Sequence, residues 1–161
     1  MTVTAMTHIW SMWTRLLVCL AVLLTALPSA AQDARPQNKV AVELLSAASA
    51  VVPGQPFLVA VRQRIAPDWH TYWRNPGDSG QAMELEWRLP EGFSASEIRW
   101  PVPERIAVGP LMNYGYADEA LFLVEITPPP ALFAERVSLR ADASWLACAE
   151  ICIPEDGAVT L

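Results

Sequence analysis

An all-β fold, an antiparallel β-sandwich of the immunoglobulin-like type preceded by a cleavable signal peptide, is what this sequence predicts. Three observations support it: short segments with alternating apolar and polar residues, 14 prolines that separate them, and no segment with a convincing helical period. Proline is excluded from central strands and helix interiors, so its frequency favours short strands joined by turns. Alternating βαβ units would need helices between the strands, and a sandwich is therefore expected.

The amino terminus has the parts of a secretory signal peptide. Arg15 precedes an apolar run over 16–27, which Pro28 and the small residues at 29–31 close. This run is shorter than the roughly 20 residues of a membrane-spanning helix, so a retained anchor is the weaker interpretation. We expect cleavage after Ala31.

One domain is expected after cleavage, because the remaining length suits a single core. Residues 32–38 are polar and contain a proline, which is typical of a flexible lead-in, and the folded domain is expected over 39–161. The net charge is −6 and no cluster of Lys and Arg is present. This argues against nucleic acid, or an anionic membrane surface, as a partner bound through a general positive field.

The first strands are expected around a turn signal. Apolar residues alternate with others over 40–44 and again over 57–61, and Val-Pro-Gly over 52–54 marks a turn between them. The run Trp-His-Thr-Tyr-Trp over 69–73 is interpreted as a partly buried aromatic strand. Asp-Ser-Gly over 78–80 is interpreted as a turn.

The clearest strand is expected over 83–89. Its apolar residues alternate with Glu and Arg, and the segment stops at Pro-Glu-Gly over 90–92. Each of the remaining strands is bounded by Pro or Gly. They are expected over 93–100, 120–126, 137–145 and 158–161.

The cysteines predict one disulfide in an exported domain. Cys19 lies inside the apolar run and would leave with the signal peptide, so Cys148 and Cys152 remain as a pair. A disulfide needs Cα atoms within roughly 7 Å, whereas four residues of one extended strand span about 13 Å. The chain must therefore bend. We expect the strand that ends near Trp145 to give way to a tight turn carrying both sulfurs.

The spacing leaves the role of this bridge open. In the chain-entropy model, a bridge that closes so short a loop contributes only about 2 kcal/mol to stability, which argues against a mainly structural role. Short exposed bridges also exchange readily with other thiols. Most disulfides of exported domains are inert, so a non-catalytic interaction module with a structural disulfide is the alternative. A soft metal held by both thiolates and His70 ranks third, and neither a metal nor a cofactor is expected. The nearby acids Glu150, Glu155 and Asp156 would raise the thiol pKa, so no local activator is visible.

Four blocks of sequence carry a family resemblance. They are WHTYWRNPGDSG over 69–80, WPVPER over 100–105, NYGY over 113–116 and CAEICIPE over 148–155. In this order they resemble the amino-terminal periplasmic domain of the DsbD thiol:disulfide interchange protein family, and most closely its ScsB-like branch. The resemblance covers essentially the whole mature chain.

The resemblance implies an immunoglobulin-like domain of a protein-disulfide reductase in the periplasm of a Gram-negative bacterium. Cys148 and Cys152 would be the exchanging pair, acting through a mixed disulfide that the second thiol resolves. Which cysteine attacks first is left open. The implied partners are a thioredoxin-like electron donor and oxidised periplasmic thiol proteins, with a membrane partner if the chain is a fragment of a longer protein.

The family also uses a loop that caps the cysteines until a partner docks. Asn113, Tyr114 and Gly115 match its position, which makes Tyr114 the candidate shield and Gly115 the candidate pivot; a simple turn is the alternative. His70 and Tyr72 match an aromatic strand that borders the site in the family. This chain has fewer residues between its cysteines than better-known members, and it lacks their aromatic residue at Asn113.

Overall fold

The computed structural model describes residues 38–161; the predicted signal peptide and most of the lead-in lie outside them. Within this part no helix is long and apolar enough to cross a membrane. The secondary structure consists of strands joined by turns and irregular segments. The strands are β1 (Val40–Ser46), β2 (Phe57–Ile65), β3 (Thr71–Gly77), β4 (Glu84–Arg88), β5 (Ser94–Ala95), β6 (Glu104–Val108), β7 (Leu111–Tyr116), β8 (Glu119–Thr127), β9 (Arg140–Cys148) and β10 (Cys152–Thr160).

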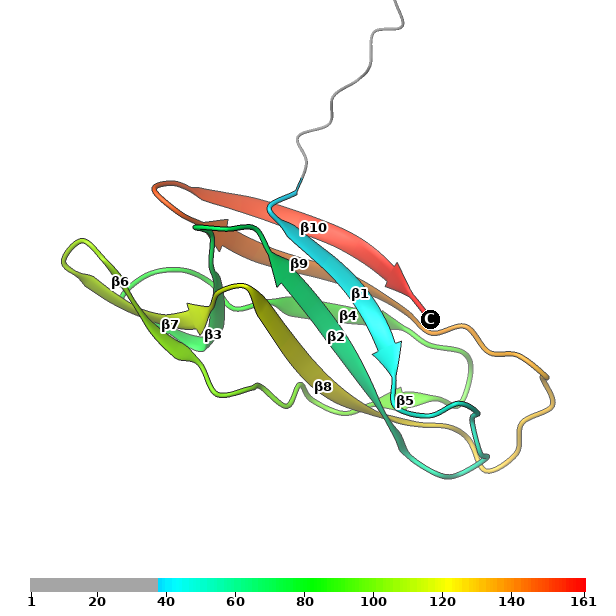
Figure 1. Ribbon diagram of the computed structural model, residues 1–161. Helices are drawn as coiled ribbons and strands as arrows, with labels where there is room; N and C mark the ends of the chain where they lie inside the picture. The colour runs from blue at the N-terminus through cyan, green and yellow to red at the C-terminus, as the bar shows by residue number, and fades with distance from the viewer. Residues whose placement is uncertain (1–37) are drawn as a thin grey trace, which may run out of the picture. The chain divides into compact units, whose positions relative to one another are not determined.

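The strands form three antiparallel sheets (Figure 1). The first has the order β1-β2-β8-β5 and the second β10-β9-β4, while β3-β7-β6 forms a smaller third sheet. Figure 1 shows this third sheet at the end of the domain where the β9–β10 turn lies. An isolated bridge between His70 and Cys148 joins the segment before β3 to β9. The predicted all-β antiparallel sandwich is confirmed.

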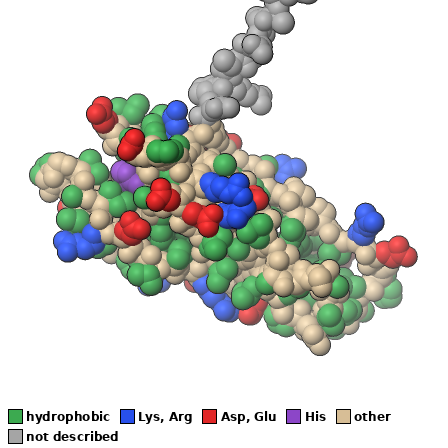
Figure 2. All heavy atoms as spheres, viewed as in Figure 1, with side chains coloured by type: hydrophobic (Ala, Val, Ile, Leu, Met, Phe, Trp, Pro, Cys, Tyr) green, Lys and Arg blue, Asp and Glu red, His purple; other side chains and the backbone are tan. Residues whose placement is uncertain are grey.

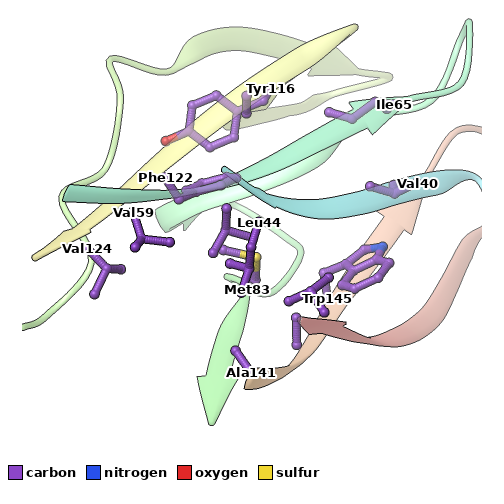
Figure 3. Close-up of a cluster of buried hydrophobic side chains, with 14 of the residues drawn as sticks. Val40, Leu44, Val59, Ile65, Met83, Tyr116, Phe122, Val124, Ala141 and Trp145 are labelled. Atoms are coloured by element: carbon purple, nitrogen blue, oxygen red, sulfur yellow. The ribbon is translucent and has the colours of Figure 1, made fainter. Parts of the chain in front are cut away.

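The core lies between the first two sheets. Figure 3 shows Val59, Phe122 and Trp145 among side chains that reach it from different strands. In β8 every second residue is buried and its neighbours are more exposed, as expected for a strand with one face on the core. The same alternation runs through β9, whose core face carries Ala141, Ala143, Trp145 and Ala147.

A buried carboxylate ties the first strand to the last. Glu155 Oε1 accepts a hydrogen bond from the Lys39 backbone N–H at 2.6 Å, and Oε2 accepts one from the Val40 N–H at 3.1 Å. The Trp145 Nε1–H also donates to Oε2 at 3.1 Å. A buried charge is tolerated when its hydrogen-bonding capacity is met, and three donors meet it here. The start of β1 is thereby held against β10.

The strand expected over 93–100 is largely absent. Only β5 and a single bridge between Arg99 and Leu123 remain of it. Between them the Ser96 Oγ accepts the Glu125 backbone N–H at 3.0 Å, so a side chain replaces the strand backbone as the acceptor.

The sequence predicts no strands over 104–116, where the structure has β6 and β7. They form a hairpin that turns at Gly109, whose φ of 56° lies in the left-handed region favoured by glycine. Neither face of β6 is fully buried, so no alternating apolar pattern marks it.

The last two strands also differ from the expected bounds. β9 begins at Arg140 rather than at Val137 and continues to Cys148, and β10 begins at Cys152 rather than near Ala158. β10 is the edge of its sheet, where Pro154 interrupts no central ladder. Because β10 contains a proline and acidic residues, no alternating apolar pattern marks its first part.

Figure 2 shows acidic and basic side chains scattered among apolar ones over the visible face. Several large apolar side chains are exposed, and Phe133 is 99% exposed. Phe122, in contrast, is 0% exposed and packs edge-on against the rings of Trp100 and Tyr116, with centroids 5.2 Å away in both cases. These two phenylalanines therefore form a matched pair for testing the core.

We expect Phe122→Ala to lower the free energy of unfolding by about 3–5 kcal/mol, because it removes a buried ring and leaves a cavity. Phe133→Ala is the control and is expected to change it by less than about 0.5 kcal/mol. Urea denaturation of both variants checks this. Equal effects of the two substitutions would contradict the core assignment.

Candidate functional site

Cys148 and Cys152 close the tip of the β9–β10 hairpin and are joined by a disulfide. Their Cα atoms lie 4.1 Å apart across the three-residue turn 149–151. The Cys148 N–H and C=O both bond to His70 on the other side of β9. The two cysteines are thus a non-hydrogen-bonded pair, the arrangement that brings paired side chains closest.

The bend predicted between the cysteines is confirmed, but its expected position is wrong. β9 does not end near Trp145; it continues to Cys148, and Cys152 already belongs to the next strand. Within one extended strand the two cysteines would lie too far apart for a disulfide. In the structure they lie on two antiparallel strands, which place them opposite each other.

Alternation along β9 decides which way Cys148 points. Trp145 and Ala147 face the core, so Cys148 belongs to the opposite face, together with Leu146 and the exposed Ser144. Cys148 is nevertheless only 1% exposed, whereas Cys152 is exposed to solvent. The two sulfurs are therefore unequal in access.

His70 and Tyr72 lie beside the bridge. His70 pairs with Cys148 through its backbone, and Tyr72 is two residues further along the same strand face. Their rings are 5.2 Å apart and edge-on, and His70 Nε2 lies 3.2 Å from Tyr72 Oη. Tyr72 Oη in turn lies 3.9 Å from Cys152 Sγ. A continuous set of polar atoms thus leads to the exposed sulfur.

Burial shifts the pKa values of these two side chains in opposite directions. It lowers the pKa of His70 from its ordinary 6.5, because a buried imidazolium loses hydration. It raises the pKa of Tyr72 from 10.0, because a buried phenolate would lose hydration as well. At neutral pH the pair is a neutral imidazole and a phenol.

Glu155 does not act as the acidic neighbour of the thiols that the sequence suggested. Its side chain points into the core from the face of β10 opposite Cys152, where its carboxylate is bound by backbone N–H groups and by Trp145. Glu150 lies in the turn itself and is not buried. Within residues 38–161, no group of three His, Cys, Asp or Glu side chains is arranged to hold a metal ion.

The candidate cap residues lie on β7, in the sheet beside β3. Gly115 is opposite Tyr72, and a Cβ at Gly115 would come within 2.0 Å of the Thr71 carbonyl oxygen, so the close approach requires glycine. Tyr114 packs edge-on against Trp73, with ring centroids 6.5 Å apart. The structure places these residues next to the site in a strand; their roles as shield and pivot stay predictions.

Asn113 is 1% exposed and anchors the β3–β4 loop. Its Oδ1 accepts hydrogen bonds from the Ser79 N–H at 3.0 Å and from the Ser79 hydroxyl at 3.1 Å. The next residue, Gly80, has a φ of 96° and lies flat against Tyr72, where a Cβ would be 2.2 Å from a ring carbon. Asn113 thereby holds the loop that fixes the Tyr72 ring. The sequence predicts only a turn at Ser79 and Gly80, because the residues that they contact, Asn113 and Tyr72, are not their neighbours in the sequence.

Comparison with known proteins places these observations in a family. The family model described as "Thiol:disulfide interchange protein DsbD, N-terminal" matches residues 41–161. No curated protein matches at a significant level.

Two solved structures are similar to this chain. The N-terminal periplasmic domain of ScsB from Proteus mirabilis has 24% sequence identity and a TM-score of 0.57, over 79% of this chain and 48% of that chain. The DsbD N-terminal domain of Neisseria meningitidis in the reduced form has 18% identity and a TM-score of 0.49, over 79% of this chain and 87% of that chain.

The chain thus spans about half the length of the ScsB domain it matches, and that likeness shows a shared fold. The family match is broader evidence, because it covers nearly all described residues and includes both cysteines. It agrees with the four sequence blocks, with the all-β sandwich and with the disulfide at the hairpin tip. The chain therefore belongs to the family of amino-terminal domains of the DsbD thiol:disulfide interchange proteins.

Proposed function

We propose that this domain passes reducing equivalents to oxidised proteins of the bacterial periplasm through Cys148 and Cys152. The observation that carries the proposal is the unequal access of the two sulfurs: Cys152 is open to a partner, while Cys148 is covered. In thiol–disulfide exchange, the accessible sulfur forms a mixed disulfide with the partner. The second thiol of the pair then resolves this mixed disulfide.

The position of the bridge argues against a purely structural role. β9 and β10 are already paired along their whole length, from Cys148 and Cys152 to Arg140 and Thr160. A bridge across the three-residue turn closes a very short loop, which contributes only about 2 kcal/mol in the chain-entropy model. The hairpin register does not need it.

The exchange follows from this geometry. The Cys152 thiolate attacks one sulfur of the partner disulfide, forms an intermolecular disulfide and releases the other partner sulfur as a thiolate. The Cys148 thiolate then attacks the Cys152 sulfur, restores the intramolecular bridge and releases the second partner sulfur. Two electrons pass to the partner, whose two thiolates take up the two protons that the domain has lost.

A second exchange must return the domain to its dithiol form. We propose a thioredoxin-like electron donor for this step, whose thiolate attacks the accessible Cys152 sulfur and expels Cys148 as a thiolate. Membership of the DsbD amino-terminal family supports both the donor and the periplasmic location.

The reduction potential of the Cys148 and Cys152 pair tests the proposal directly. We expect a value among the exchange proteins, roughly −120 to −270 mV, measured by equilibration with thiol buffers and thiol trapping. A potential well below about −300 mV is typical of structural bridges and would remove the function.

Single-cysteine variants test the order of attack. Cys148→Ser keeps the exposed thiol and is expected to form a mixed disulfide with oxidised glutathione at least about tenfold faster than Cys152→Ser, which keeps only the covered thiol. Mass spectrometry under non-reducing conditions measures both yields. Because each variant loses one sulfur and the same bridge, they control for each other, and equal rates would contradict the assignment.

A further inference from the structure

Two polar side-chain atoms connect the interior of the domain to the exposed Cys152 sulfur. His70 Nε2 is 3.2 Å from Tyr72 Oη, which is 3.9 Å from Cys152 Sγ. A phenol hydroxyl can donate to either neighbour. A disulfide sulfur is a weak acceptor and an anionic thiolate a much stronger one, so the better acceptor for the Tyr72 hydroxyl changes when the bridge is reduced.

We propose that in the reduced domain Tyr72 conveys the proton of Cys152 to His70, so that His70 serves as the base for the attacking thiol. The inference rests on the proposed function and deepens it by naming the activator of the exposed cysteine. Tyr72 contacts the reacting sulfur and is the catalytic residue of the pair. His70 does not contact the sulfur. It accepts the proton through Tyr72 and is therefore a positioning residue.

The proton transfer balances without any further reactant. The Cys152 S–H bond breaks and its proton binds Tyr72 Oη, while the original phenol proton moves to His70 Nε2. The products are a thiolate, an intact phenol and an imidazolium. The imidazolium loses its proton when the bridge re-forms, and this proton is one of the two that the partner thiolates take up.

The starting protonation states suit this transfer. Burial lowers the pKa of His70 and raises that of Tyr72, so at neutral pH the imidazole has a free nitrogen and the phenol keeps its proton. The two side chains are 6% and 2% exposed, which limits competition from water. The tight contact between Gly80 and the Tyr72 ring fixes the hydroxyl in place.

Charged groups on the adjoining segments are engaged elsewhere or solvated. The Asp78 carboxylate accepts a backbone N–H of β7, and the Lys39 Nζ lies 5.5 Å from the centre of the Trp69 ring. Asp68 and Glu150 are not buried. Among the residues that the structure describes, none of these four groups is hydrogen-bonded to the imidazole or the phenol.

The pH profile of Cys152 alkylation tests the relay. The reduced chain is treated with iodoacetamide at a series of pH values, and modification of Cys152 is followed by mass spectrometry. We expect Tyr72→Phe and His70→Gln to move the ionisation midpoint of Cys152 upward and to slow its alkylation at pH 7 by about tenfold for each unit of that shift.

A matched control is available in Tyr116→Phe. Tyr116 is also a buried tyrosine, but its hydroxyl donates to the Pro101 carbonyl oxygen at 3.0 Å. We expect its alkylation profile to coincide with that of the unsubstituted chain. A Tyr72→Phe profile equal to that of this control, in a folded variant, would overturn the relay.

A measurement on the unsubstituted chain covers the case in which a variant fails to fold. The His70 imidazole is titrated by NMR in the oxidised and reduced states, because a thiolate coupled to it stabilises the imidazolium and raises its midpoint. An identical midpoint in both states would overturn the relay. The thiol-exchange function would still stand in that event if the reduction potential lies among those of exchange proteins.

Discussion

The alternation of side chains along β9 is the constraint on which the site depends. Because Trp145 and Ala147 enter the core, Cys148 must leave the strand on the opposite face, and the hairpin register then places Cys152 beside it. The same strand edge receives the backbone of His70. A slip of one residue would turn Cys148 inward and Trp145 outward, so the apolar contacts of the core hold the sulfurs where they react.

Stability and chemistry therefore use different faces of one strand. The core side of β9 contains alanines and a tryptophan, while the outer side carries the Cys148 sulfur, which is buried as well. The bridge itself lies on the outer face, away from the side chains that pack in the core. The access of each sulfur is set by its neighbours in space, which is why Cys148 and Cys152 differ although they are paired.

Strands with alternating apolar residues could be predicted from the sequence, as β1, β2, β4 and β8 show. The first part of β10 could not, because Pro154 lies at a sheet edge and Glu155 is buried with its own donors, and neither produces an apolar pattern. The bend between the cysteines could also be predicted, because an extended strand would hold their Cα atoms too far apart for a disulfide. The surroundings of the bridge come from tertiary contacts: family resemblance pointed to His70 and Tyr72, but nothing local revealed that Gly80 approaches the Tyr72 ring closely.

The carboxylate of Glu155 has a consequence for how the chain acquires its structure. It binds the backbone of Lys39, 116 residues earlier, so this contact has one of the largest sequence separations in the domain. Contacts of this kind form late and slow the search for the native state, since a long loop must close before they stabilise anything. During synthesis, β1 cannot bind this carboxylate until Glu155 has emerged, whereas β9 and β10 are separated by only three residues. Pairing of the two cysteines therefore closes a far shorter loop than the contact that joins the first strand to the last.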